Sequence, residues 1–348
     1  MPEPAPIQPD RRFGSGGPTL AAVGEVALID QLVAIAGSHS RPIAGFPAGD
    51  DAALWHPPSG CDVAVSIDAL VEDVDFRRGW ITPRQLGRRA FAVAVSDLAG
   101  TGAEPIHCLA TLCARRTEQV EDVLEIQRGL CEAAAAAGCA VAGGDVSAID
   151  GPLVIDVSVT GIVPAGHALR RSAGRPGDVL IVTGVLGRAA AGLRLLLDDD
   201  HGASSTEQRW VESQLQPATR LREGRRLLAG GVRCGGDVSD GLVIDALRTA
   251  RASGCAVELW ADYLPVDPAL VERFGKKWLE LAIGGGEDFE LFAAVAETEV
   301  EALLRDWPGE LAPLTTVGAF CRGEGVRLLD GPEGTELPLP PTHAGHFS

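Results

Sequence analysis

Short β-type runs alternate with helical stretches along most of the chain, and this alternation limits the possible folds more than any other feature of the sequence. Residues 61–68, CDVAVSID, alternate polar and apolar side chains and predict a strand that ends at Asp68. Residues 82–102 predict a helix that has Thr82 as its N-cap, a proline at its first position and glycines at its end. The order of elements predicts an α/β fold.

The remaining elements continue the pattern. The further predicted strands are residues 106–113, 139–144, 153–163, 179–184, 256–261, 289–295 and 325–330. The further predicted helices are residues 117–138, 188–197, 219–231, 240–254 and 298–307.

A stretch rich in Gly, Pro and Arg, PAGHALRRSAGRPGD, interrupts the alternation and predicts a boundary between two α/β halves of comparable size. The beginning of the chain is rich in Pro, Gly and charge, with little apolar surface to bury, and predicts a disordered tail. We therefore expect a tail at 1–22, an N-terminal domain at 23–163, a linker at 164–177 and a C-terminal α/β domain at 178–348.

The chain carries 30 Lys and Arg against 48 Asp and Glu, a formal net charge of −18. This balance disfavours a broad phosphate-backbone footprint and therefore nucleic acid as a partner. The eight cysteines form no C-x-x-C pair, which predicts reduced and mostly buried thiols. No apolar run reaches the ~20 residues of a membrane span, and the N-terminus lacks the apolar middle of a signal peptide. We expect a cytoplasmic protein with no membrane partner.

Most of the chemically suggestive side chains are aspartates that follow predicted strands or adjoin glycines. They are Asp50, Asp51, Asp68, Asp97, Asp145, Asp237 and Asp240. Any one of them alone is more typical of a turn or a helix cap, as Asp240 is before the predicted helix that begins GLVIDAL. Their number, in a chain with only two lysines, favours carboxylates that hold Mg²⁺ against substrate phosphates. The stretch GGDVS occurs twice, and its glycines allow backbone N–H groups to approach phosphate oxygens.

Several other site types are excluded by their missing patterns. The sequence has no G-x-x-x-x-G-K-[ST], no G-x-G-x-x-G after a strand and no H-E-x-x-H, which excludes P-loop, dinucleotide and common zinc-hydrolase sites. The stretch GGGEDFEL suggests a metal or cationic-substrate contact through Glu287 and Asp288. A tight turn entering the following strand explains the same letters equally well.

Seven motifs follow one another along the chain: GDDAAL, SIDALVEDVDF, SDLAGTGAEP, GGDVSAIDGP, RRSAGRPGDVLIVTG, DVSDGLVIDAL and GGEDFEL. They occur in the same order in thiamine-monophosphate kinases, and from about Gly24 nearly to its end the chain resembles that family. The family belongs to the ATP-binding superfamily of aminoimidazole ribonucleotide synthetase and selenophosphate synthetase. The resemblance implies two α/β domains and a homodimer whose N-terminal sheets pair into a β-barrel. It also implies transfer of the γ-phosphoryl group of ATP to thiamine monophosphate, with several Mg²⁺ ions.

The resemblance further implies a role for each matching residue. The implied magnesium ligands are Asp51, Ser66, Ile67 through its backbone carbonyl, Asp68, Asp97, Asp145, Asp237 and Asp240. Four of these, Asp51, Asp68, Asp97 and Asp240, are also the implied catalytic residues. The implied ATP contacts are Gly144, Asp145, Arg171 and Ser239, and the implied substrate contacts are Asp75 and Glu287. By the same analogy, the two GGDVS stretches are phosphate-and-metal loops.

The chain departs from the family pattern at three positions. Asp75 stands where the family usually has a substrate-contacting histidine, Ile67 where it has a hydroxyl residue, and Ala344 where it has an aromatic residue. Two of these positions, Asp75 and Ala344, fall on the acceptor side. The sequence therefore leaves open an enzyme of the same fold with another acceptor, and a non-catalytic protein that binds nucleotide or metal.

Overall fold

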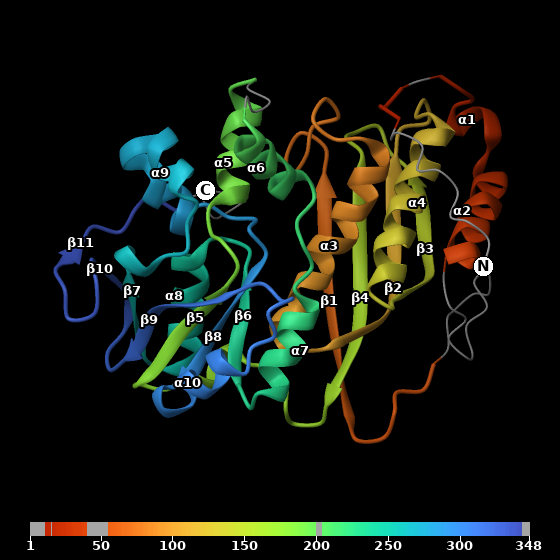
Figure 1. Cartoon of the computed structure of the whole chain (residues 1–348). Coiled ribbons are helices and arrows are strands. Elements are labelled where there is room, and N and C mark those ends of the chain that lie inside the picture. Colours follow the sequence, from red (N-terminus) through yellow and green to blue (C-terminus); the bar gives the residue numbers. More distant parts are fainter. Residues whose placement is uncertain (1–10, 15, 40–54, 200–203, 343–348) are drawn as a thin grey trace. The chain divides into compact units, whose positions relative to one another are not determined.

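The computed structural model describes residues 11–14, 16–39, 55–199 and 204–342 (Figure 1). The chain divides into two compact units. Unit 1 consists of Met1–His56, Ile67–Ala94 and Ile106–Val159, and unit 2 of Pro57–Ser66, Val95–Pro105 and Thr160–Ser348. The mixed α/β character that the alternation predicts is confirmed.

Unit 1 is built on a four-stranded sheet with the strand order β1-β4-β2-β3. The strands are β1 (Cys61–Val71), β2 (Glu104–Ala114), β3 (Ala140–Ala148) and β4 (Val154–Pro164), and the helices are α1 (Leu20–Val23), α2 (Glu25–His39), α3 (Pro83–Thr101) and α4 (Val120–Ala136). The last turns of α3 and one end each of β1, β2 and β4 belong to unit 2. Figure 1 shows α3 and α4 on the same side of this sheet.

Helix α3 begins as the sequence predicts. The Thr82 Oγ1 accepts the backbone N–H of Gln85 at 3.2 Å, and the Gln85 side chain accepts the backbone N–H of Thr82 at 3.1 Å, which forms a capping box. Helices α3 and α4 then approach closely at two glycines. A Cβ on Gly87 would lie 1.9 Å from the Ile126 carbonyl oxygen, and a Cβ on Gly129 would lie 1.9 Å from that of Arg84.

Unit 2 is built on a seven-stranded mixed sheet with the order β11-β10-β7-β9-β5-β8-β6. Its strands are β5 (Asp178–Thr183), β6 (Cys234–Val238), β7 (Ala256–Trp260), β8 (Glu290–Ala296), β9 (Leu314–Cys321), β10 (Gly325–Leu329) and β11 (Glu336–Leu337). Strands β7 and β10 are parallel, and every other neighbouring pair is antiparallel.

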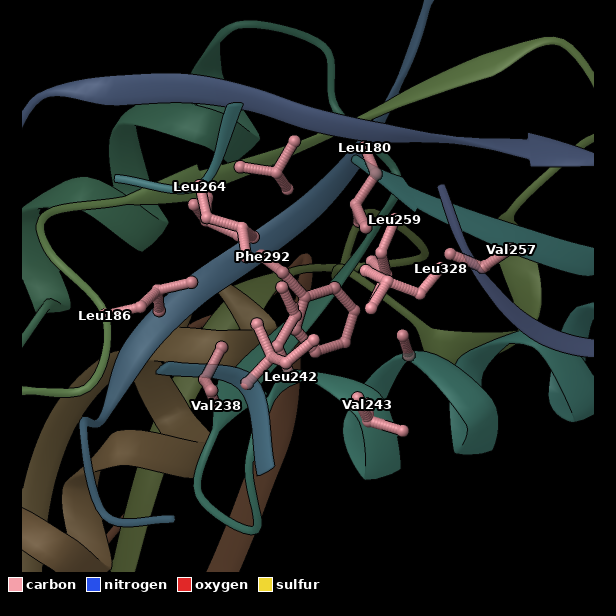
Figure 2. Packing of buried hydrophobic residues seen from close by; sticks show 14 of the residues in the cluster. Leu180, Leu186, Val238, Leu242, Val243, Val257, Leu259, Leu264, Phe292 and Leu328 are labelled. Atoms are coloured by element: carbon pink, nitrogen blue, oxygen red, sulfur yellow. The ribbon is translucent and has the colours of Figure 1, made fainter. Parts of the chain in front are cut away.

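The core of unit 2 lies between this sheet and helix α8 (Leu242–Ser253), as Figure 2 shows. Leu242 and Phe292 are among its fully buried side chains. The other helices are α5 (Arg188–Leu197), α6 (Ser205–Leu215), α7 (Leu221–Ala229), α9 (Pro268–Phe274) and α10 (Glu297–Arg305), with short helical turns at Arg171–Ala173, Ala261–Tyr263, Gly275–Lys277 and Glu280–Gly284. A smaller cluster around Trp210 joins α5 and α6.

The structure corrects two local predictions. Strand β1 continues to Val71, so Asp68 lies within the strand and does not end it. The first GGDVS lies inside β3, and the second supplies β6 and only then leaves the sheet at Ser239, so neither stretch is a free loop. The reason is close backbone approach, since a Cβ on Gly144 would lie 2.0 Å from the Ala110 carbonyl oxygen. Asp97 lies in α3, within the helix predicted at 82–102.

The sequence interpretation also missed α6 and β9. Neither described sheet closes into a barrel within the chain. Part of the predicted tail makes contacts in unit 1: the Gly14 N–H donates to Asp122 at 2.8 Å, and the Leu20 N–H donates to the Glu118 carbonyl at 2.8 Å. All eight cysteines are free thiols, as predicted, and five of them are buried. Among the described helices, none combines the length and apolar character needed to cross a bilayer.

The α3–α4 contact predicts a sharp difference between two glycine substitutions. Gly129→Ala should destabilise the protein by about 1–3 kcal/mol or more, because its Cβ meets backbone that has no room to move. Gly37→Ala in α2 should be neutral or stabilise by up to about 1 kcal/mol, because nothing lies within 4 Å of its Cβ. Urea denaturation of both variants measures the difference, and equal midpoints would refute the close contact.

Candidate active site

Two aspartates of unit 2 face one cavity where the end of α3 meets β6. The Ser66 Oγ donates to Asp97 at 2.5 Å, and the Ser96 Oγ donates to Asp237 at 2.7 Å. The cavity is about 260 Å³ in volume, and its lining includes Ser66, Asp97, Arg171 and Asp237. Four residues that the family motifs single out therefore meet in one place.

Glycine makes this approach of helix to strand possible. A Cβ on Gly100 would lie 3.0 Å from the backbone nitrogen of Asp237, and one on Gly224 would lie 2.0 Å from the Ala99 carbonyl oxygen. Helix α7 and strand β6 thus both contact the last turn of α3 through backbone. Larger side chains at these positions would separate Asp97 from Asp237.

Asp237 is held in an unfavourable electrostatic setting. Its side chain is almost fully buried, and burial together with the nearby charge of Asp97 raises its pKa to about 6. The hydrogen bond from Ser96 and the charge of Arg171, whose Nη2 lies 3.4 Å from Asp237, act in the opposite direction. Two close carboxylates with a single nearby cation are a donor set that suits a hard divalent ion.

The other predicted magnesium ligands lie elsewhere in the described chain or outside it. Asp51, like its neighbour Asp50, lies outside the described residues. Asp68 and Ile67 lie in β1 and Asp145 in β3, all three within unit 1. The Ser147 Oγ donates to Asp145 at 3.1 Å. In the described ranges no three His, Cys, Asp or Glu side chains are grouped closely enough to hold a metal by themselves.

Asp240 does not cap the helix that follows it. The N-cap of α8 is Gly241, and the Asp240 carboxylate instead accepts a hydrogen bond from the Arg248 guanidinium. The capping interpretation of Asp240 is therefore wrong. A residue that the sequence interpretation passed over, Asp245, accepts the backbone N–H groups before the helix.

The stretch GGGEDFEL forms a tight turn, as the simpler of its two interpretations predicts. Glu287 has φ 69° and Phe289 has φ 48°, left-handed conformations that cost energy for residues with side chains. Two hydrogen bonds hold the turn against the end of β6: the Glu287 N–H donates to the Ser239 carbonyl at 2.8 Å, and the Phe289 N–H donates to that of Val238 at 3.0 Å. An implied ATP contact, Ser239, and an implied substrate contact, Glu287, are therefore neighbours.

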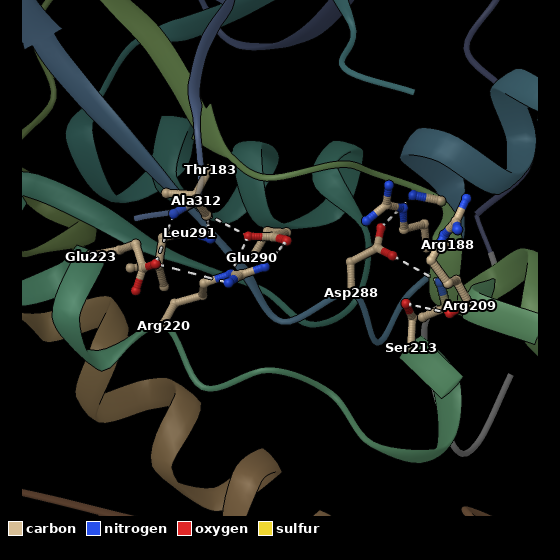
Figure 3. Close-up of polar contacts among 12 residues, drawn as sticks. Thr183, Arg188, Arg209, Ser213, Arg220, Glu223, Asp288, Glu290, Leu291 and Ala312 are labelled. Carbon is tan, nitrogen blue, oxygen red and sulfur yellow. Dashed lines mark hydrogen bonds and ion pairs between the residues drawn. The ribbon is translucent and has the colours of Figure 1, made fainter. Parts of the chain in front are cut away.

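The side chains of this turn have separate partners. The Glu287 carboxylate accepts a hydrogen bond from the buried Gln214 on α6. The Asp288 carboxylate accepts the N–H groups of Gly187 at 2.6 Å and Ala189 at 3.1 Å and so caps α5 (Figure 3). Burial raises the pKa of Asp288 to about 7.

A second ionic group lies just beyond the turn. Glu290 accepts two hydrogen bonds from Arg220, each at 2.6 Å, and one from the Thr183 hydroxyl at 2.6 Å (Figure 3). A bidentate pair with its remaining oxygen sites occupied is rigid. It fixes the start of β8, so the preceding turn has a firm anchor. The motif GGEDFEL contains Glu290 but gives no sign of its pairing with Arg220, because an arginine and a glutamate this far apart in sequence leave no local pattern.

Unit 1 carries the remaining predicted residues. Asp75 accepts the backbone N–H of Val71 at 2.8 Å, so part of its hydrogen-bonding capacity closes a local turn. Gly144 and Asp145 line a cavity of about 140 Å³, which α2, α4, β2 and β3 enclose mainly with apolar side chains. Gln127 and Thr111 are the uncharged polar residues on its wall. Ala344 lies outside the described residues.

Comparison with known proteins places the chain in one family. Residues 49–163 match the N-terminal domain of the AIR synthase related proteins, and residues 175–328 match the C-terminal domain of the same group. The Bacillus subtilis thiamine-monophosphate kinase is 32% identical over 301 residues, which cover 86% of this chain and 92% of the relative. The chain therefore belongs to the thiamine-monophosphate kinase family.

Solved structures agree with this assignment. The thiamine-monophosphate kinase from Stenotrophomonas maltophilia is 32% identical and superimposes with a TM-score of 0.78 over 88% of this chain and 97% of that one. The structure of AaThiL complexed with AMPPCP and TMP is 28% identical, with a TM-score of 0.72 over 94% of this chain and 98% of that one. That relative holds an ATP analogue together with TMP.

The capping carboxylate of α5 predicts a pH dependence of stability. Because the pKa of Asp288 rises from 3.8 to about 7 on folding, the folded state binds more protons between these values. Its contribution to stability is therefore present below about pH 4 and is lost as the pH rises through about 7. Asp288→Asn should remove this decline and raise the unfolding free energy at about pH 8 by on the order of 1–2 kcal/mol, a value reduced for partial exposure.

Denaturant titrations across the pH range measure this effect. Asp198→Asn, at an exposed residue that ends α5, is the matched control and should follow the wild-type profile. An Asp288→Asn profile parallel to that of the wild type would contradict the assignment.

Proposed function

We propose that this chain phosphorylates thiamine monophosphate to thiamine diphosphate at the expense of ATP, by in-line transfer at the Asp97–Asp237 cavity. The observation that carries the proposal is this carboxylate pair, which lies with Arg171 and Ser66 in one cavity of unit 2. Family membership and the relative that binds AMPPCP with TMP support the choice of substrates.

The donor set fits magnesium, and Mg²⁺ would supply the positive charge that aligns two phosphate-bearing substrates. We propose Asp97 and Asp237 as ligands, together with Ser66, the backbone carbonyl of Ile67 and the remaining implied carboxylates Asp51, Asp68, Asp145 and Asp240. The raised pKa of Asp237 supports this proposal, because a carboxylate destabilised by burial and by a like charge gains most from a bound cation.

The chain's own residues have complementary tasks. Arg171 borders the cavity and provides a guanidinium for nucleotide phosphate oxygens, as the resemblance implies. Ser239 and Glu287 are joined through the backbone, so a nucleotide contact and an acceptor contact would be held at a fixed spacing. The acceptor phosphate is already ionised near neutral pH, so transfer needs no protein base.

We propose the apolar cavity of unit 1 as the adenine site. Its walls are largely aliphatic, and Gly144 and Asp145, the implied ATP contacts, lie on its lining. An aromatic base is suited to such a cavity, and the few polar groups there, Gln127 and Thr111, would orient it.

A direct assay tests the activity. Wild-type protein with ATP, Mg²⁺ and thiamine monophosphate should form ADP and thiamine diphosphate, separated by chromatography, and EDTA should abolish both products. Asp97→Asn should lower the rate by ~10²-fold or more, because it removes a charge contact made in the transition state. Asp68→Asn should act similarly.

Asp198→Asn, at an exposed residue, should keep the wild-type rate. Turnover with another phosphate acceptor but not with thiamine monophosphate would favour the alternative that Asp75 raises. ATP binding without turnover of any acceptor would favour a non-catalytic relative.

We further propose the domain division 23–163, 164–177 and 178–348 and a homodimer formed through the sheet of unit 1. The family-model matches at 49–163 and 175–328 support the division. Val63, Val65 and Ile67 alternate along β1, so they share one face, and they are 46%, 66% and 63% exposed. An apolar strand face of this kind is a favourable surface for pairing with a second copy. We also propose a cytoplasmic location, which free and mostly buried thiols favour.

A charge on this face should prevent dimer formation. Val65→Glu should give a monomer in light scattering coupled to size exclusion, because burying a lone carboxylate in an apolar interface is costly. Val271→Glu, at a partly exposed position on α9, is the control and should stay dimeric. A wild-type monomer, or a dimeric Val65→Glu, would refute this interface.

A further inference from the structure

Asp245 lies in the first turn of α8 and is fully buried. Its Oδ2 accepts the backbone N–H of Ser239 at 3.1 Å and that of Asp240 at 3.0 Å. Bonds from N–H groups to a carboxylate are charge-assisted and strong. The carboxylate therefore fixes the main chain of two residues, Ser239 and Asp240, that we assign to the nucleotide and its metal.

Arg248 connects the same carboxylate to the surface. One of its nitrogens, Nη1, donates both to Asp240 and, at 3.1 Å, to Asp245 Oδ1. The side chains of Arg248 and Asp240 are 47% and 36% exposed, whereas that of Asp245 is 0% exposed. One guanidinium thus holds an outer carboxylate and an inner one.

This shared contact determines what happens when a cation approaches Asp240. A divalent ion and Arg248 compete for the same carboxylate, and release of the guanidinium is unfavourable if it leaves that group without an anionic partner. Asp245 remains as that partner. When Arg248 releases Asp240, it loses one of its two carboxylate contacts and keeps the other, to Asp245.

We propose that Asp245 is a positioning residue for phosphoryl transfer: it fixes the Ser239–Asp240 turn and retains Arg248, so that Asp240 is free to bind a divalent cation. The inference rests on the proposed function in assigning Asp240 to the metal. A carboxylate that served only as a helix cap would stabilise the turn and leave cation binding unchanged.

The test measures Mn²⁺ binding in the presence of ADP by electron paramagnetic resonance on the full-length chain. Asp245→Asn keeps an oxygen acceptor for the backbone but gives Arg248 no second anion, so it should raise the Kd for Mn²⁺ roughly tenfold. Arg248→Gln removes the competitor and should lower the Kd. The double variant should return toward or below the wild-type Kd. Burial raises the pKa of Asp245 to about 7, so the comparison is made at about pH 8, where the carboxylate is ionised.

Asp122→Asn is the matched control. Asp122 is also fully buried in the first turn of a helix, α4, where it accepts the Gly14 N–H at 2.8 Å and lies 3.5 Å from Arg11. Its replacement should leave Mn²⁺ binding as in the wild type.

Three results would overturn the inference. The first is an Asp245→Asn protein that binds Mn²⁺ within twofold of the wild type. The second is a double variant that binds as weakly as Asp245→Asn. The third, which stands even if Asp245→Asn does not fold, is an Arg248→Gln protein with unchanged or weaker binding. A wild type that forms no thiamine diphosphate would contradict the proposed acceptor, while the Mn²⁺ comparison would still decide the role of Asp245.

Discussion

The candidate site in unit 2 depends on two neighbouring carboxylates, Asp97 and Asp237, of which Asp237 is almost fully buried. Asp237 is 2% exposed and feels the charge of Asp97, a combination that opposes its ionisation. The protein offsets this cost only in part, through the Ser96 hydroxyl and a long contact to Arg171. A buried charge with incomplete compensation is poor for stability and well suited to binding a cation, so the feature is better explained by function than by folding.

The backbone geometry follows from the same requirement. Asp97 comes from a helix and Asp237 from a strand, and the two meet because Gly100 lets the helix end approach β6. Strand β6 in turn fixes Ser239, whose carbonyl holds the strained turn at Glu287. The bidentate Arg220–Glu290 pair anchors the far side of that turn. Hydrogen bonds before and after the turn therefore maintain the strained backbone at Glu287 and Phe289. Such strain is expected where a side chain must be held in one orientation.

The sequence predicted the class of the fold and most elements, because capping signals such as Thr82 and regular apolar spacing are local properties. It was wrong about the two GGDVS stretches, since glycine and aspartate are typical of turns. Only the neighbouring strand shows that Gly144 is needed for close packing against Ala110, a non-local requirement. The positioning residues Ser96 and Asp245 were missed for a related reason. Each acts through a partner on a different element or through backbone, and such roles leave no spacing pattern.

The net charge of −18 means that the protein needs cations to bind a phosphate-rich substrate. A polyanionic substrate would be repelled by an acidic chain, so the cations that compensate must be either resident or taken from solution. Two of the resident cations of unit 2, Arg171 and Arg248, each contact a carboxylate that we propose as a metal ligand. If Asp237 bound a divalent ion, Arg171 would be free to contact phosphate oxygens, whereas Arg248 would stay paired with Asp245. Arginine suits both states because its guanidinium stays charged and pairs equally well with carboxylate and phosphate.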